Sequence, residues 1–252
     1  MLPGERVPSP TDALPSPPPD NSPVAVASQL AAVEAAIRDR SRPVADLDRL
    51  GRDQQELYRL VAQHPEWEAG LVAQVPAPLR PVVDANLVAG RELALLAPAP
   101  SPTPPHWRIV APAPARELLA HYKAAELALG VPWPYLAAIH LVETRMGRIR
   151  GTSSAGAQGP MQFLPETWAA YGAGGDINSD RDAVLAAARL LARRGAPAHM
   201  AAALFAYNPS DHYVKAVSAY AGVMAADERA YFAYHGWQVY YGDRLLPEGF
   251  VG

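Results

Sequence analysis

The sequence predicts a mainly helical protein, for three reasons. Apolar residues recur at spacings of three and four over most of the chain, as they do on the buried face of an amphipathic helix. Segments with the alternating pattern of a half-buried strand are few. Half of the 252 residues are hydrophobic, which is enough to form a core.

The composition excludes several classes of function. The formal net charge is −3, so the chain has no polycationic surface for nucleic acid. It has no cysteine, which excludes disulfides, thiol nucleophiles and cysteine-based zinc sites. The seven histidines show no paired ligand spacing, and we expect neither a metal nor another cofactor. No segment approaches the ~20 apolar residues of a transmembrane helix.

Residues 1–23 form the first segment and hold eight of the 27 prolines. Because proline has no N–H to donate and the segment offers few side chains to bury, we expect a disordered, extended tail. The segment has neither the cationic start nor the uninterrupted apolar run of a secretory signal.

Residues 24–97 are predicted to be a small helical accessory region. Two or three antiparallel helices would bury its two apolar stripes. Gly51 lies within the first stripe and costs that helix ~1 kcal/mol of propensity. The region carries no recognisable chemistry, so we expect it to support or dock the rest of the protein. The first stripe comprises Leu47, Leu50, Leu57, Leu60 and Val61, and the second comprises Val83, Leu87, Val88, Leu93 and Leu96.

Residues 98–113 form a second proline-rich tract. This tract is predicted to be a semi-rigid linker or a strap that lies on a surface. Trp107, Ile109 and Val110 favour the strap, since a free linker does not need large apolar side chains.

Residues 114–252 form the larger helical domain. Gly130, Gly147 and Gly195 are placed to end three of its helices. The C-terminal residues 237–252 mix aromatic and turn residues and receive no assignment. Helices are predicted near 115–129, 134–146, 165–171, 180–194, 198–207 and 211–225.

Glu143 is the most informative residue of this domain. Helical geometry places it on one row with Leu136, Ile139 and Met146, all of which favour burial. Burial raises the pKa of a carboxyl toward neutrality, which is the property of a general acid. The alternative is a frayed helix end at which the carboxylate pairs with Arg145, Arg148 or Arg150.

Four stretches, in this order, carry a resemblance to a known family. They read ETRMG from Glu143, SSAGAQGPMQFLPETW from Ser153, GDI from Gly175 and AYNPSDHYV from Ala206. As a set, they resemble the lytic transglycosylase domain over roughly residues 118–220. The resemblance implies a lysozyme-like, mostly helical catalytic domain that cleaves the glycan strands of peptidoglycan. Residues 1–97 share nothing recognisable with that family.

The resemblance also implies roles for individual residues. Glu143 corresponds to the family's single catalytic acid and base. Ser153, Met161 and Gln162 fall where the family lines its sugar cleft. Glutamine can donate and accept hydrogen bonds at once, which suits the recognition of sugar hydroxyls and amides.

Tyr207 and Asn208 match the family's Tyr–Asn pair, and the resemblance implies that the tyrosine hydroxyl faces the catalytic carboxylate. Two departures from the family pattern stand nearby. Thr144 replaces a common serine, and Pro209–Ser210 replaces the usual pair of small residues. Neither departure removes a required functional group, but the second puts the shape of the cleft wall in doubt.

An ordinary glycosidase needs a second carboxylate, and the sequence offers poor candidates for it. Glu166 stands in the first turn of a helix, and Asp182 stands three residues after Ser179, as in a capping box. Structural roles also account for Asp176 and Asp180. The resemblance implies another route, in which the substrate's 2-acetamido group acts as nucleophile and the muramyl C6 hydroxyl then forms a 1,6-anhydro end.

Three functions therefore remain open. The leading one is a lytic transglycosylase acting on the MurNAc-β-1,4-GlcNAc bond, with peptidoglycan as its partner. The second is a lysozyme-type muramidase that hydrolyses the same bond, and the third is a wall-binding or assembly module of low activity. Each implies the cell envelope or secretion, with an export signal absent from the given sequence. Residues 24–97 are then the expected contact for envelope partners.

Overall fold

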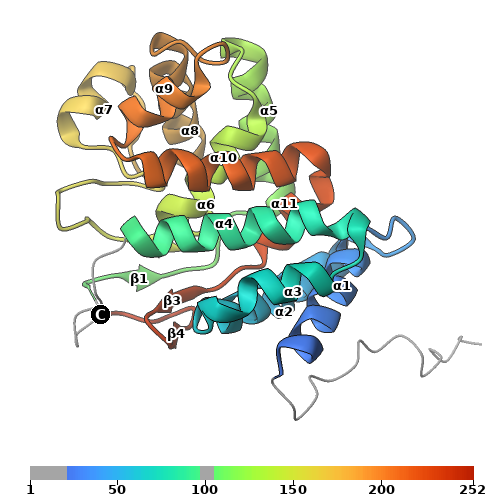
Figure 1. The fold of residues 1–252 in the computed structure, drawn as a ribbon. Coiled ribbons are helices and arrows are strands. Elements are labelled where there is room, and N and C mark those ends of the chain that lie inside the picture. Colours follow the sequence, from blue (N-terminus) through green and yellow to red (C-terminus); the bar gives the residue numbers. More distant parts are fainter. Residues whose placement is uncertain (1–21, 97–104) are drawn as a thin grey trace, which may run out of the picture.

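The computed structural model describes residues 22–96 and 105–252, and over these residues the fold is mainly helical (Figure 1). The N-terminal helices are α1 (Pro23–Arg38), α2 (Leu47–Ala62), α3 (Glu68–Gln74) and α4 (Arg80–Leu96). The later helices are α5 (Ala115–Leu129), α6 (Trp133–Thr144), α7 (Pro165–Tyr171), α8 (Asp180–Arg193), α9 (Met200–Tyr207), α10 (Asp211–Ala226) and α11 (Glu228–His235). The mainly helical class predicted from the sequence is confirmed.

The described strands are short and form two antiparallel pairs. Strand β1 (Arg108–Ile109) pairs with β2 (Ile149–Arg150), and β3 (Val239–Tyr241) pairs with β4 (Arg244–Leu246). Single turns of 3-10 helix join the N-terminal helices. Among the described residues, no helix has the length and the hydropathy that crossing a bilayer requires.

Local signals explain where the helices begin and end. The Ser179 hydroxyl accepts a hydrogen bond from the Asp182 N–H at 3.3 Å and caps α8, as the sequence indicates. Helix α6 ends at Thr144, earlier than predicted, because Arg145 and Met146 take left-handed φ values of 53° and 58°. Helix α1 already begins at Pro23, within the predicted tail.

One hydrophobic core joins the N-terminal helices to the rest of the protein. Helix α4 packs along α10, and helices α1 and α2 pack against α11 (Figure 1). Gly51 allows the approach of α2 to α11, since a Cβ there would overlap the carbonyl oxygen of Ala233. The helices of residues 24–96 thus form one body with the domain that follows.

Residues 105–113 lie on the surface as a strap. Pairing with β2 holds the strap through β1, with Arg108 opposite Arg150. Ile109 is buried with Val239 and Leu246 in a small second cluster. The remainder of the predicted linker and the tail up to residue 21 lie outside the described residues.

Candidate functional site

Helix α6 carries Glu143 out of the core to the surface. The helix is apolar almost all round and central, with Leu136 and Ile139 fully buried. Met146, predicted on the same row, lies beyond the end of the helix and is also buried, whereas Glu143 in the last turn is partly exposed. The carboxyl therefore has an apolar base and an accessible end.

Tyr213 holds this carboxyl. Its hydroxyl donates a hydrogen bond of 2.7 Å to Glu143 Oε1 from α10. Burial raises the pKa of Glu143 from 4.5 to about 7, and the Tyr213 hydrogen bond acts in the opposite direction. Both protonation states are therefore populated near neutral pH, which lets one group donate and then accept a proton.

The arginine pairing considered for Glu143 is wrong. The Arg145 guanidinium donates to the carbonyl oxygen of Leu141 at 2.9 Å. Arg148 donates to the carbonyl oxygen of His235, and Arg150 lies 3.5 Å from Asp180. The carboxyl is thus held by a phenol and not by a cation.

The Tyr207 hydroxyl forms no hydrogen bond with the Glu143 carboxyl, although the two groups lie close enough that, besides burial, the Glu143 charge raises the pKa of Tyr207. That hydroxyl donates to the carbonyl oxygen of Met161 at 2.6 Å, and it is Tyr213 that donates to Glu143. The rings of Tyr207 and Tyr213 are parallel, with centroids 6.3 Å apart. Burial raises the pKa of both phenols well above its ordinary value, so both remain donors at neutral pH. Tyr207 positions the loop, and Tyr213 contacts the carboxyl.

The loop at residues 158–163 is fixed beside the end of α6. Thr144 donates its hydroxyl to the carbonyl oxygen of Pro160 at 2.6 Å. Gln158 and Phe163 pair as an isolated bridge across the loop. Gly159 has no room for a side chain, since a Cβ would overlap the carbonyl oxygen of Ile177. The loop therefore has a defined shape next to Glu143.

The other residues predicted to line the cleft differ in their exposure and in their hydrogen bonds. Gln162 is half-buried, has φ of 51° and donates its side-chain amide to the Gly159 carbonyl at 2.9 Å. The Met161 side chain is fully buried in the core, so the prediction that it lines a cleft is wrong. Ser153 accepts from the Ala157 N–H at 3.0 Å and closes its own turn.

Asn208 ends α9 and is half-buried, and its N–H bonds to the Leu204 carbonyl at 3.0 Å. Only the phenol of Tyr213 among the described residues hydrogen-bonds to the Glu143 carboxyl. The sequence contained one signal for this contact, because Tyr213 closely follows the Tyr–Asn motif, in the first turn of the next helix.

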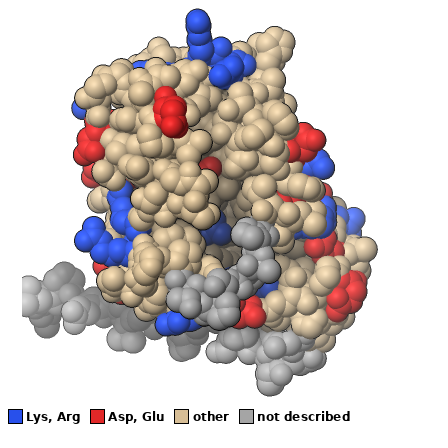
Figure 2. Space-filling view, turned by 90° about the vertical axis from the view of Figure 1, so that its left-hand side faces the viewer, with Lys and Arg blue, Asp and Glu red and all other residues tan. Residues whose placement is uncertain are grey.

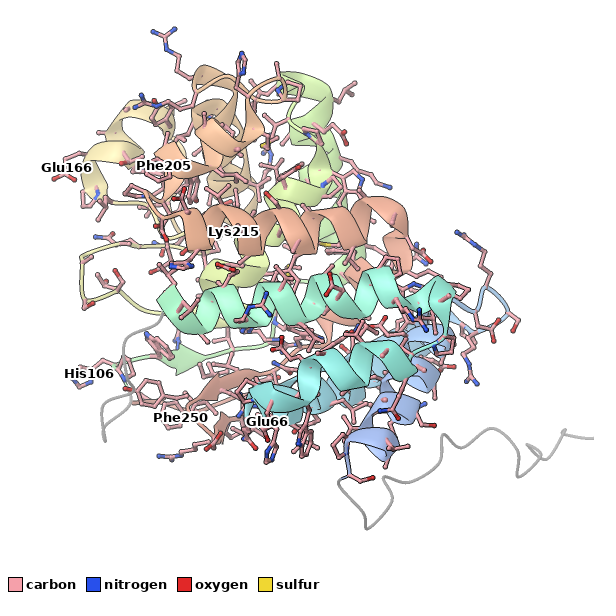
Figure 3. The ribbon with its side chains drawn as sticks, in the orientation of Figure 1. Glu66, His106, Glu166, Phe205, Lys215 and Phe250 are labelled. Atoms are coloured by element: carbon pink, nitrogen blue, oxygen red, sulfur yellow. The ribbon has the colours of Figure 1, made fainter. Side chains whose placement is uncertain are left out.

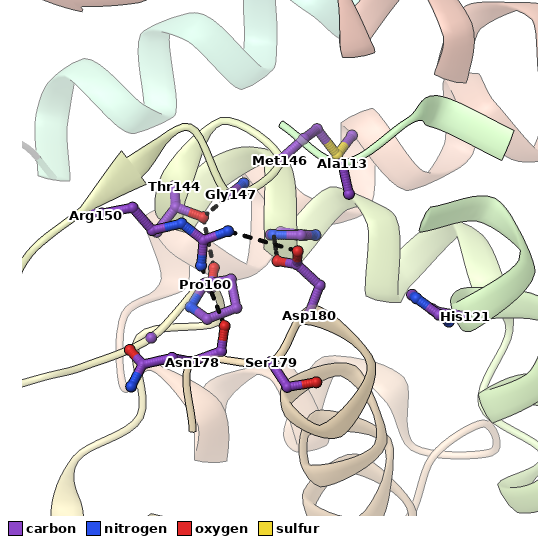
Figure 4. A network of polar contacts seen from close by, with 12 residues as sticks. Ala113, His121, Thr144, Met146, Gly147, Arg150, Pro160, Asn178, Ser179 and Asp180 are labelled. Carbon is purple, nitrogen blue, oxygen red and sulfur yellow. Dashed lines mark hydrogen bonds and ion pairs between the residues drawn. The ribbon is translucent and has the colours of Figure 1, made fainter. Parts of the chain in front are cut away.

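The other carboxylates near this part of the chain have structural roles. Glu166 is exposed on α7 and points away from the body of the protein (Figure 3). Asp182 accepts from the Asp176 N–H at 3.0 Å, and Asp176 accepts from the Asn178 N–H at 2.9 Å. Asp180 faces Arg150 (Figure 4). The pKa of Glu143 is set by burial and by Tyr213, not by a neighbouring charge.

His140 is a buried core histidine on α6. Its Nδ1 lies 2.6 Å from the hydroxyl of Tyr122, and its Nε2 lies 3.6 Å from Asp180 Oδ1. Burial lowers the pKa of His140 to about 3, so the imidazole is neutral. The described residues contain no group of three histidines or acids suited to a metal ion.

Figure 2 shows a hollow on the face that lies at the left of Figure 1, with acidic and basic atoms inside it. Comparison of the chain with protein-family models, curated proteins and solved structures gives no match.

Proposed function

We propose that this protein is a peptidoglycan lytic transglycosylase with Glu143 as its catalytic acid and base. The observation that carries the proposal is the state of this one carboxyl. It stands at the end of a buried helix, is held by the Tyr213 hydroxyl at 2.7 Å and has a pKa of about 7. The four motifs that resemble the lytic transglycosylase domain support the same assignment.

In the first step of the proposed reaction, protonated Glu143 gives its proton to the glycosidic oxygen of the MurNAc-β-1,4-GlcNAc bond. The bond from that oxygen to the muramyl C1 breaks, and the carbonyl oxygen of the 2-acetamido group bonds to C1 in its place. The carboxylate of Glu143 then takes the proton of the muramyl C6 hydroxyl as O6 bonds to C1. The acetamido group leaves, a 1,6-anhydro end forms and Glu143 is protonated again, without water.

A single carboxyl suits this sequence of steps. Hydrolases that retain or invert the anomeric centre use a second carboxylate as nucleophile or base. Here the substrate's own acetamido and hydroxyl groups take those parts. Gln162 and Asn208 are half-buried beside the proposed cleft and offer side-chain amides to sugar hydroxyls.

The mass of the soluble products tests the proposal. Purified murein is digested with the protein and the fragments are analysed by mass spectrometry. Anhydromuramyl ends support the lytic transglycosylase. Ends heavier by one water support a lysozyme-type hydrolase instead, and binding to insoluble murein without release supports a wall-binding module.

Glu143→Gln provides the matched control for this experiment. The amide keeps the shape of the side chain and accepts the Tyr213 hydrogen bond, but it cannot donate a proton and then accept one. We expect product release to fall by about 10³-fold or more, while the circular dichroism spectrum stays that of the wild type. Full activity of this variant would contradict the assignment of Glu143.

The proposed substrate also bears on location and partners. Murein lies outside the cytoplasmic membrane, so the proposal includes export to the envelope or secretion. It includes no cofactor. Envelope partners that dock through α1 to α3 remain part of the proposal, since these helices lie at the far side of the molecule from α7 and α9 (Figure 1).

A further inference from the structure

A cavity of about 440 Å³ lies next to the site, between α2, α4, α10 and β3. Cavities of this size hold small ligands and peptide segments. Its walls are mainly apolar, and they include the aromatic rings of Tyr58, Tyr220, Trp237 and Tyr240. The N-terminal helices therefore help to form a cavity as well as a core.

Arg145 brings a charge into this cavity. It follows the end of α6 and lies two residues after Glu143, so their Cα atoms are at most ~7.6 Å apart. Its backbone has a left-handed φ of 53°, which a non-glycine residue rarely adopts. Across this turn, the Glu143 carboxyl contacts Tyr213 whereas Arg145 lines the cavity. Backbone strain of this kind is common at functional sites.

The other charged groups and the side-chain amides that line the cavity are already paired within the protein. Glu68 and Arg91 form an ion pair at 2.6 Å. The Arg59 guanidinium lies 3.6 Å above the Tyr240 ring and 3.6 Å from Asp243. The amides of Gln55 and Asn86 and the hydroxyl of Tyr58 are bonded to neighbouring protein groups.

Arg145 differs from these groups. Its guanidinium donates to the Leu141 carbonyl and lies 5.9 Å from the centroid of Trp237. Among the described residues, no carboxylate forms an ion pair with it. Burial lowers the pKa of Arg145, which means that its environment disfavours the charge. A half-buried guanidinium without a carboxylate partner, set among aromatic walls, can donate hydrogen bonds to an anion that has apolar neighbours.

We propose that this cavity is a subsite for the carboxylates of the peptide stem of peptidoglycan, with Arg145 as their partner. The inference rests on the proposed function and adds a substrate feature to it. The stem is attached to the muramyl sugar, whose C1 would react beside Glu143, and it combines carboxylates with small apolar side chains. The apolar walls of the cavity match the alanines, and Arg145 matches a carboxylate.

Two peptide probes test the subsite by isothermal calorimetry on the full chain. One is the N-acetylated stem tetrapeptide with free carboxylates, and the other is the same peptide with every carboxylate amidated. We expect the wild type to bind the acid at least about tenfold more tightly than the amide, as a charge-assisted contact requires. We expect Arg145→Asn to abolish this preference, because asparagine tolerates the left-handed backbone but carries no charge.

Two further variants test whether the positive charge at position 145 causes the preference for the acid peptide. Arg145→Lys restores a point charge, and we expect it to recover part of the preference. Arg193→Asn removes an exposed arginine of α8 and should leave the preference unchanged. Equal binding of acid and amide by the wild type, no binding of either, or a preserved preference in Arg145→Asn overturns the subsite.

Digestion of murein by the same preparations separates this inference from the proposed function. Anhydro products without a preference for the acid peptide would leave the transglycosylase standing and remove the subsite. A preference that depends on Arg145, without any cleavage, would leave the anion subsite standing and remove the transglycosylase.

Discussion

The Glu143–Tyr213 contact decides what this site does at a given pH. A carboxyl that is only buried would hold its proton too firmly to act as a base. The hydroxyl of Tyr213, 2.7 Å from Oε1, stabilises the ionised form and brings the pKa back to about 7. Because the pKa of Tyr213 is itself raised by burial, its hydroxyl stays a donor throughout the cycle.

Tyr213→Phe should therefore move the pH dependence of the proposed reaction. Loss of the hydrogen bond raises the pKa of Glu143 above about 7. The acid step needs the protonated carboxyl, so the alkaline limb of the rate profile should shift to higher pH. We expect the maximal rate to fall roughly tenfold, because the carboxylate loses a positioned donor. Initial rates of soluble product release between pH 5 and 9 measure both effects.

Tyr207→Phe is the matched control, since Tyr207 lies parallel to Tyr213 but donates to the Met161 carbonyl. This variant loosens the loop and lowers the rate without moving the alkaline limb. A limb that stays in place for Tyr213→Phe, or that moves equally for both variants, would contradict the role given to Tyr213.

Glu143→Gln should stabilise the fold at alkaline pH. The pKa of Glu143 is raised from 4.5 to about 7, so the folded protein keeps a proton that the unfolded chain releases in this range. Stability is therefore lost as pH rises from about 4.5 to about 7. At ~1.4 kcal/mol per unit, reduced for the partial exposure of the carboxyl, the variant gains about 2 kcal/mol at pH 8.

Urea unfolding of the wild type and Glu143→Gln at pH 4 and pH 8 measures this difference. The gain should vanish at pH 4, where folded and unfolded chains both carry the protonated carboxyl. An equal gain at both pH values would mean that ionisation of Glu143 is not its cause.

The sequence predicts Glu143 but not its partner. A carboxyl on an apolar helical row is visible within one segment of the chain, because helical spacing alone defines the row. Tyr213 is 70 residues away, and only the packing of α10 on α6 brings it to the carboxyl. The fully buried Met161 shows the reverse case, in which a motif position was expected at the surface and tertiary packing placed it in the core.

At the scale of elements, helices with local signals were predictable. Helices α5 and α7 match the predicted ranges, and α8 has the cap that the sequence indicates. Helix α11 and the β3–β4 hairpin were not predicted. Helix α11 is short and aromatic, and it is stabilised by packing against α2 rather than by propensity.

Gly51 illustrates how packing overrides propensity at this scale. Within one helix, Gly51→Ala would favour folding by ~1 kcal/mol. In the protein, the new Cβ overlaps the carbonyl oxygen of Ala233 and forces α2 away from α11. We expect a net loss of about 3 kcal/mol in the free energy of unfolding, measured by urea denaturation.

Gly222→Ala is the matched control for this substitution. Gly222 lies inside α10, is exposed and has open space where its Cβ would be. We expect a gain of about 0.5–1 kcal/mol there. If Gly51→Ala also gained stability, the close approach of α2 to α11 would be refuted.

At the scale of the whole molecule, buried polar contacts bind the N-terminal helices to the rest. Gln54 accepts a hydrogen bond from the Trp237 indole at 3.0 Å, and Asn86 accepts one from the Tyr234 hydroxyl at 2.7 Å. His212 Nδ1 lies 2.7 Å from Glu92 Oε2, and His212 directly precedes Tyr213, the residue that donates to Glu143. Removing the N-terminal helices would leave their hydrogen-bond partners in the rest of the protein unpaired, and it would also expose the apolar core.

The fragment 105–252 should therefore fail to fold by itself, although it contains every motif of the proposed catalytic domain. Its loss of α4 would uncover the face of α10 that packs on α4, and α10 is the helix that carries Tyr213. The full chain should unfold in one transition that tryptophan fluorescence and far-ultraviolet circular dichroism report at the same urea concentration. The fragment should show no cooperative transition, since much of its core surface is open to water. Two transitions in the full chain would contradict a single continuous core. A fragment that unfolds cooperatively and releases anhydro products would show that the site does not need residues 22–96.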